Sequence, residues 1–246
     1  MSPEKNAGAK RVLPFIIIGG VLVAVVVGGA LALRKDGAQP SPSPGAAASQ
    51  PGAGATQPAS PTAARRESPG AQPPHTKGRA VAPVVLEEFG DYQCPPCGMM
   101  HPVLKKIGED YGDRVAIVFR NFPLQKIHKN AFSAARAAEA AGMQGKFWEM
   151  NDLIYTNQKE WSESPEPRPL FESYARKLGL NIDKYKADLE KPETAARIIA
   201  DFQRGDTLGV TGTPSIFLNG RQLPVESSLS EPRLRAEIDA ALASKK

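Results

Sequence analysis

The stretch that decides the fold runs from Val84 to Cys97 and reads VVLEEFGDYQCPPC. Its first part, VVLEEF at 84–89, has the apolar content of a β-strand, and GDYQ at 90–93 is typical of a turn. Proline is well tolerated in the first turn of a helix, so CPPC at 94–97 marks the start of one. Two cysteines therefore lie where a strand ends and a helix begins.

The residues that follow extend this pattern into a strand–helix–strand unit. Apolar side chains recur at helical spacing after Cys97, and the pattern ends near Tyr111. These side chains belong to Met100, Val103, Leu104 and Ile107. RVAIVF at 114–119 then has the composition of a second strand. A strand, a helix and a strand in this order predict a βαβ unit with the two strands parallel.

Most of the chain beyond this unit is predicted to be helical. The predicted helices cover 129–143, 147–155, 170–178, 182–189 and 192–202, and glycine or proline lies at the breaks between them. Strand character returns at 215–218, and the Asn-Gly pair at 219–220 predicts a hairpin into 222–225. A last amphipathic helix begins at Pro232. The sequence thus predicts an α/β domain with a helical block inserted at about 127–208.

The region before Val81 has a different composition. No Val, Ile, Leu, Met, Phe, Tyr or Trp occurs between residues 36 and 80, so this region supplies no apolar core. Its Pro, Ala, Gly, Ser and Gln content is typical of a disordered linker, which we expect at 34–80. His75 lies in it and is expected to be solvated. One domain at 81–246 is the predicted folded part.

An uncharged apolar run at 12–33 precedes the linker and is long enough to cross a bilayer. The alternative is a signal peptide cleaved near ALA at 30–32, but the run exceeds the usual apolar length of a signal peptide of about 7–15 residues. We therefore expect an uncleaved single-pass anchor in the cell membrane. The flanking charges, KR at 10–11 and RK at 34–35, favour only weakly a cytoplasmic N-terminus at 1–11. The folded domain is then expected on the extracytoplasmic, periplasmic side.

The excess of positive over negative charge lies in the N-terminal region of the chain. The net charge is +5, but from Val81 onward 22 Lys and Arg face 23 Asp and Glu. A nucleic-acid-binding domain carries a basic face, which a nearly neutral domain lacks. The sequence therefore predicts no nucleic-acid partner.

The chain has only two cysteines, and they are three positions apart, so they form a site and not a disulfide scaffold. Cys94 falls at the predicted N-cap, where free N–H groups and the helix dipole lower a thiol pKa and favour the nucleophilic thiolate. Cys97, one turn into the helix, is expected to be more buried and to resolve a mixed disulfide by attack on Cys94.

Other uses of a CxxC pair fit less well. A zinc site needs four ligands, and only His101 and His128 are left in the predicted domain. Haem attachment needs a histidine directly after the second cysteine, where Gly98 stands. We expect no cofactor and no resident metal. A dithiol module for Cu(I) stays open, because Met99, Met100 and His101 follow Cys97.

Taken together, these motifs resemble the DsbA-like branch of the thioredoxin superfamily, in its membrane-anchored form. The resemblance rests on the strand, turn and CxxC at 84–97, FPL at 122–124 with His128, the alanines around Glu139, GKFW at 145–148 and TGTPSIF at 211–217. It covers nearly all of 81–246 and implies a thioredoxin-like fold with an inserted helical block. It also implies protein disulfide oxidoreductase activity.

The resemblance assigns roles to three further residues. Thr213–Pro214 is expected to be a cis peptide bond beside Cys94, in a loop whose backbone receives an extended substrate chain. Glu88 corresponds to a partly buried acid that takes up the proton of Cys97. The alternative for Glu88, as for Glu87, is a position on the solvent face of the strand.

The sequence departs from the family between the cysteines, where Pro95 and Pro96 stand and strong oxidants carry a histidine before the second cysteine. Pro96 supplies no positive charge, so we expect a reduction potential between about −120 mV for strong oxidants and about −270 mV for thioredoxin. The predicted partners are cysteine-containing exported proteins and a redox partner at the membrane. The protein itself is predicted to be a monomer. A reductase or isomerase using the same site remains open.

Overall fold

The computed structural model describes residues 68–245. The predicted anchor at 12–33 and the linker up to residue 67 lie outside the described residues. Between residues 68 and 245, none of the helices has the length and apolar content that crossing a membrane requires.

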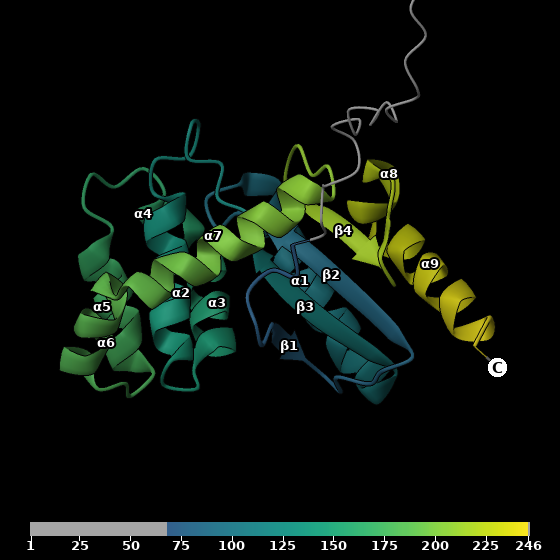
Figure 1. The fold of residues 1–246 in the computed structure, drawn as a ribbon, viewed down its shortest axis with the longest axis horizontal. Coiled ribbons are helices and arrows are strands. Elements are labelled where there is room, and N and C mark those ends of the chain that lie inside the picture. The colour runs from purple at the N-terminus through teal and green to yellow at the C-terminus, as the bar shows by residue number, and fades with distance from the viewer. Residues whose placement is uncertain (1–67, 246) are drawn as a thin grey trace, which may run out of the picture. The chain divides into compact units, whose positions relative to one another are not determined.

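A five-stranded sheet forms the centre of the domain, with strand order β1-β3-β2-β4-β5 (Figure 1). The strands are β1 (His75–Lys77), β2 (Val84–Gly90), β3 (Val115–Asn121), β4 (Ser215–Leu218) and β5 (Arg221–Gln222). β2 and β3 pair in parallel, while β1 runs antiparallel to β3 and β4 antiparallel to β2. The predicted βαβ unit is confirmed, with α1 (Pro95–Tyr111) as its crossover helix.

Two apolar layers cover the faces of this sheet. On one face, α1 and α9 (Glu231–Ala243) pack on β2, β3 and β4 around Leu104, Ile117 and Leu234. On the other face, Phe89 of β2 and Phe217 of β4 form a smaller cluster. The strands nearest the cysteines are therefore held from both sides.

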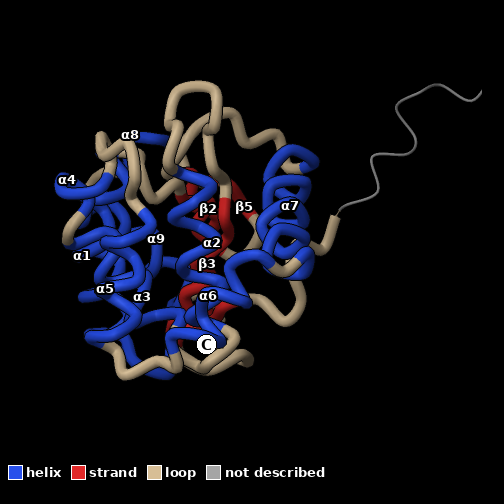
Figure 2. Tube along the Cα trace, turned by 90° about the vertical axis from the view of Figure 1, so that its left-hand side faces the viewer, coloured by secondary structure: helices blue, strands red, loops and turns tan. Residues whose placement is uncertain are grey.

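The inserted block consists of six helices that lie beside one another in Figures 1 and 2. They are α2 (Ala131–Gly142), α3 (Phe147–Thr156), α4 (Gln158–Trp161), α5 (Arg168–Lys177), α6 (Ile182–Glu190) and α7 (Pro192–Thr207). α2 lies at the centre of the block and contacts α3, α5, α6 and α7. Its buried alanines have small side chains, so the neighbouring helices pack close to its backbone. The largest apolar cluster of the described residues lies here and includes both cysteines.

The C-terminal part differs from the prediction in one element. The predicted strand at 222–225 is wrong beyond Gln222, because β5 covers only Arg221–Gln222 and Val225 begins the short helix α8 (Val225–Ser228). Pro224 lies between them and has no N–H to continue the strand ladder. The Asn219-Gly220 turn is confirmed, with both residues at positive φ.

The predicted disordered linker also extends too far. Residues 68–80 belong to the folded domain: β1 pairs with β3, and Ala71 is buried. The prediction that His75 is solvated is wrong, because its ring stacks on Phe147 with centroids 3.4 Å apart and its Nε2 lies 2.9 Å from Glu139. Polar contacts replace the apolar side chains that this segment lacks.

Buried ion pairs hold this N-terminal segment to the sheet and to α7. Asp201 accepts hydrogen bonds from the backbone N–H of Ala71 at 2.9 Å and from Arg120 at 2.9 Å. Arg120 also donates to the carbonyl of Ala71 and to Glu87, both at 2.8 Å. Glu87 therefore does not face solvent. Burial raises its pKa, but hydrogen bonds from Arg204 and Arg120 outweigh that effect and lower it.

Candidate active site

The two cysteines lie at the junction of β2 and α1, as predicted. Cys94 is the N-cap of α1 with extended backbone angles, and Pro95 occupies the first helical position. The carbonyl of Cys94 accepts the first helical hydrogen bond, from Gly98 N at 3.1 Å. The side chain of Cys94 is 6% exposed and Cys97 is fully buried. Both are free thiols, so the structure represents the reduced form.

The pKa values of the two thiols are shifted in opposite directions. The pKa of Cys94 is lowered to about 6, mainly by a hydrogen bond from Cys97 and further by Thr213, against the effect of burial. Burial, together with the charge of Cys94, raises the pKa of Cys97 well above its usual range. At neutral pH Cys94 is therefore mostly thiolate and nucleophilic, while Cys97 keeps its proton.

The loop before β4 lies directly beside Cys94. The Sγ of Cys94 is 3.3 Å from the carbonyl oxygen of Thr213. The Thr213–Pro214 peptide bond is cis, as the resemblance implied. The buried hydroxyl of Thr213 bonds no other group within the described part of the chain, which leaves it available to the Cys94 sulfur, whose pKa it lowers. The loop thus presents backbone and hydroxyl groups at the nucleophilic sulfur.

Glu88 lies in β2, on the face of the sheet that α1, the helix of Cys97, covers. It is 5% exposed, and its Oε1 has no hydrogen-bond partner among residues 68–245. Burial, with the charge of Cys94 as a smaller cause, raises its pKa to about 8. The structure therefore favours the buried position over the solvent-facing alternative, and a carboxyl group in this state can give or take a proton near neutral pH.

A polar network that the sequence analysis missed supports the turn before Cys94. Buried Asp91 accepts hydrogen bonds from Leu124 N at 2.8 Å and from His128 Nδ1 at 2.7 Å. Gln158 of α4 donates to the carbonyls of Tyr92 and Cys94 at 2.7 and 2.9 Å. These partners come from segments 30 to 70 positions away, so no local motif reveals them.

The same network explains the residue after Cys97. A Cβ atom at Gly98 would lie 2.7 Å from the side-chain oxygen of Gln158. Glycine at this position therefore lets Gln158 reach the backbone around Cys94.

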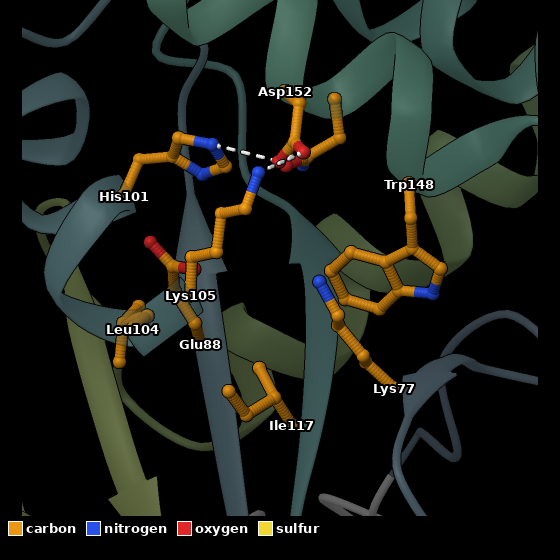
Figure 3. A pocket seen from close by; sticks show the side chains of 9 residues that line it. Lys77, Glu88, His101, Leu104, Lys105, Ile117, Trp148 and Asp152 are labelled. Atoms are coloured by element: carbon orange, nitrogen blue, oxygen red, sulfur yellow. Dashed lines mark hydrogen bonds and ion pairs between the residues drawn. The ribbon is translucent and has the colours of Figure 1, made fainter. Parts of the chain in front are cut away.

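Further along α1, a small cavity of about 20 Å³ lies beside Glu88 (Figure 3). His101 of α1 lies at this cavity and forms an ion pair with Asp152 of α3, with an N–O distance of 3.0 Å. Lys105 contacts the same carboxylate at 2.6 Å. The His101 ring also stacks on Tyr155, with centroids 4.9 Å apart.

The described residues 68–245 contain no group of three or more His, Cys, Asp or Glu arranged to hold a metal ion. The residues that kept a Cu(I) site open are also engaged elsewhere or turned outward. Met99 is exposed, Met100 packs in the core with Leu104, and His101 binds Asp152. The geometry favours thiol chemistry at Cys94 over a soft-metal site.

Comparison with known proteins places this site in a family. Residues 71–240 match the family model described as "Thioredoxin". Among curated proteins, the chain is 40% identical over 148 residues to the Na(+)/H(+) antiporter NhaA 1 of Salinispora arenicola, covering 60% of this chain and 22% of that protein. The match to NhaA 3 of Salinispora tropica is 37% identical over 174 residues, covering 66% and 26%. The chain thus spans about a quarter of the length of these relatives.

Solved structures share the fold over most of their own length. BdbD from Bacillus subtilis superposes with a TM-score of 0.60 at 24% identity, covering 69% of this chain and 93% of BdbD. A thioredoxin-like oxidoreductase from Silicibacter pomeroyi superposes with a TM-score of 0.56 at 27% identity, and the match covers 68% of this chain and 90% of that structure. The alpha-DsbA1 protein of Wolbachia pipientis superposes with a TM-score of 0.60 at 20% identity, and the match covers 70% of this chain and 92% of alpha-DsbA1.

Proposed function

The chain belongs to the thioredoxin family and is a DsbA-like thiol–disulfide oxidoreductase, and from this premise we propose that it oxidises cysteines of exported proteins while tethered to the membrane. The observation that carries the proposal is the pairing of a low-pKa thiol at Cys94 with a buried, protonated thiol at Cys97, beside the Thr213 carbonyl. The membrane segment at 12–33 and the extracytoplasmic side of the domain are parts of this proposal.

In the oxidising reaction, a client thiolate attacks Sγ of Cys94 in the Cys94–Cys97 disulfide. A client–Cys94 disulfide forms, the Cys94–Cys97 bond breaks, and the Cys97 sulfur leaves as a thiolate that takes a proton from Glu88. A second client thiolate then attacks the client sulfur of the mixed disulfide, and Cys94 leaves as a thiolate. The client loses two electrons to the enzyme. A redox partner that accepts these electrons restores the disulfide.

The acidity of Cys94 favours this direction. A thiolate that is stable in the reduced enzyme is a good leaving group and makes the disulfide easier to reduce. The pKa of Cys94, about 6, lies between the values near 7 for thioredoxin and near 3.5 for strong oxidants. This agrees with an intermediate reduction potential, which Pro96 in place of a charged histidine also favours. A reductase or isomerase with the same site is the alternative.

A groove between the segment 122–127 and the end of α7 fits the client chain. It has a volume of about 470 Å³ and is lined by apolar side chains, among them Phe122, Leu124, Ile127, Phe202 and Val210. The Leu124 end is connected to Cys94 through Asp91, which bonds to the backbone N–H of both residues. Val210 and Thr211, which also line the groove, directly precede the loop that carries Thr213. We assign the groove to an unfolded client segment that carries an apolar side chain near its cysteine.

The relatives support a site of action near a membrane. In Salinispora arenicola the similar segment is part of a protein named as a Na(+)/H(+) antiporter, which is a membrane transporter. We propose that the present chain acts as a monomer, with its domain held at the membrane by residues 12–33.

Two measurements on the full chain test this function. The first is the reduction potential of Cys94–Cys97, by equilibration with glutathione; we expect a value between about −120 and −270 mV. A value at the thioredoxin end establishes the reductase alternative. A value of about −120 mV supports the oxidant function but refutes the argument that Pro96 lowers the reduction potential.

The second measurement identifies clients. In a Cys97→Ser variant, Cys94 is first converted to a mixed disulfide with a small aromatic thiol, which a client thiolate then displaces to form a client–Cys94 disulfide. Cys97 can no longer attack this disulfide, so exported proteins should accumulate as covalent adducts until a second client thiolate releases them. The Cys94→Ser variant is the matched control and should trap none. Equal adduct yields from the two variants would contradict the assigned roles of Cys94 and Cys97.

A further inference from the structure

The cavity beside Glu88 holds polar atoms that lack partners. Glu88 Oε1 and Asn151 Oδ1 are buried, have no hydrogen-bond partner among the described residues, and belong to residues that line the cavity. A volume of about 20 Å³ is enough for one water molecule, which needs two or more polar partners. The cavity therefore meets the requirements of a water site at the Glu88 carboxyl group.

The wall of the cavity opposite Glu88 is partly open to solvent. The side chains of His101 and Asp152 are 15% and 30% exposed, and they are bonded to each other at 3.0 Å. Figure 3 shows Glu88 on β2, His101 on α1 and Asp152 on α3 placed around one cavity. A buried acid, a water site and a half-buried histidine–carboxylate pair thus follow one another from the sheet to the surface.

We propose that His101 and Asp152 pass protons between Glu88 and solvent, through one water molecule bound in this cavity. The inference rests on the proposed thiol–disulfide function and deepens it, because Glu88 serves Cys97 in that reaction. His101 acts through Glu88 and does not touch the sulfur atoms.

The reaction needs such a route because Glu88 is protonated at rest. With a pKa of about 8, its carboxyl group keeps its proton at neutral pH. When the enzyme is reoxidised, Cys97 transfers its thiol proton to Glu88 and attacks Sγ of Cys94, which releases the partner's thiolate. Glu88 accepts that proton only after it has released its own. Burial separates it from bulk water, so the release depends on groups that reach the surface.

The other charged groups at the cavity do not replace His101. Lys105 lies at the same carboxylate, and its hydrogen bond to Asp152 raises its pKa, so it keeps its proton at neutral pH. Lys77 of β1 lies over the Trp148 ring, 5.9 Å from its centroid. A protonated lysine only donates hydrogen bonds, whereas a histidine both accepts and gives protons near neutral pH. Burial raises the pKa of Tyr155, whose ring stacks on His101, well above its ordinary value of 10, so its hydroxyl keeps its proton.

The test separates the two thiol steps. Reduced full-length protein is mixed with an aromatic disulfide whose thiolate is coloured. Cys94 releases the first thiolate when it forms the mixed disulfide, and Cys97 releases the second when it resolves it. In His101→Ala we expect the second phase to slow about tenfold, while the first stays within about twofold. Added imidazole should restore most of the second phase, which a merely structural loss would not show.

Two further variants complete the test. Lys105→Ala removes the other basic partner of Asp152 and should leave both phases within about twofold of the wild type. In Glu88→Gln the second phase should be slow and insensitive to imidazole. A second phase that His101→Ala leaves unchanged, or that imidazole does not restore, overturns the relay. Loss of the first phase in the wild type would instead refute the proposed function.

Discussion

Sγ of Cys94 lies 3.3 Å from the carbonyl oxygen of Thr213, although the two residues are 119 positions apart. The register of two strands produces this contact. β4 runs antiparallel to β2, with Ser215 opposite Phe89 and Ile216 opposite Glu88. The loop that precedes β4 therefore ends beside the turn that follows β2. One strand pairing thus brings Thr213 to the nucleophile and keeps Glu88 in the centre of the sheet.

This contact predicts that Thr213 tunes Cys94. Thr213→Val keeps the shape of the side chain and removes its hydroxyl, which contributes to the lowered pKa of Cys94. A hydrogen bond to a charged group stabilises it by about 1.5–3 kcal/mol, so we expect the pKa of Cys94 to rise by about one unit. Thiolate absorbance against pH gives this value. Thr207→Val, at the C-terminal end of α7, is the control. An unchanged pKa in Thr213→Val would remove Thr213 from the site.

A second prediction concerns Pro96, the residue before the second cysteine. Pro96→His places a titratable base next to the Cys94 thiolate, and its protonated form stabilises that charge. We expect the pKa of Cys94 to fall by about one unit and the reduction potential to rise by about 30 mV, since that difference corresponds to about 1.4 kcal/mol. Equilibration with glutathione measures the change. A potential that stays constant or falls would show that Pro96 does not set the redox balance.

The cysteine site was predictable because local signals define it. A strand, a turn and a proline-containing helix start are contiguous at 84–97, and the positions of Cys94 and Cys97 follow from them. The cis bond before Pro214 was predicted from the family motif and not from its own neighbours. Burial of Glu88 stayed undecided because strand alternation alone does not say which face of β2 is covered.

The supporting contacts were not predictable for a physical reason. Residues 68–80 have no large apolar side chains, so composition indicated disorder, yet the arginines of β3 and α7 bind their backbone carbonyls. Gln158 and His128 reach the turn before Cys94 from distant parts of the chain. Hydrogen bonds between segments far apart in sequence leave no periodic pattern, whereas apolar packing does.

A third prediction tests the ion pairs that hold the N-terminal segment. Asp201→Asn removes a buried charge that faces Arg120 and receives the N–H of Ala71. Arg120 keeps Glu87 as a partner but loses one of its two buried carboxylates, so we expect the free energy of unfolding to fall by about 1–3 kcal/mol. Urea denaturation measures it. Asp113→Asn, at an exposed site, should change it by less than about 0.5 kcal/mol. Equal effects of the two substitutions would show that the segment is not held by Asp201.

The last prediction concerns how Glu88 makes stability depend on pH. Its pKa is about 8 in the folded protein, against an ordinary value of 4.5. Between these values the unfolded chain releases this proton while the folded protein keeps it. The contribution of Glu88 to the free energy of unfolding is therefore fully present below its ordinary pKa, declines as the pH rises, and is lost above about pH 8.

Glu88→Gln cannot titrate, so its stability should lack this decline. Relative to the wild type, we expect the variant to gain about 3 kcal/mol in the free energy of unfolding between about pH 5 and about pH 8. Cys94 has a lowered pKa and an opposite pH dependence, but it is present in both proteins and largely cancels in the difference. Urea denaturation of the reduced proteins across this pH range measures the gain. A constant difference would mean that Glu88 has an ordinary pKa, and the proton transfer assigned to it would then lack its basis.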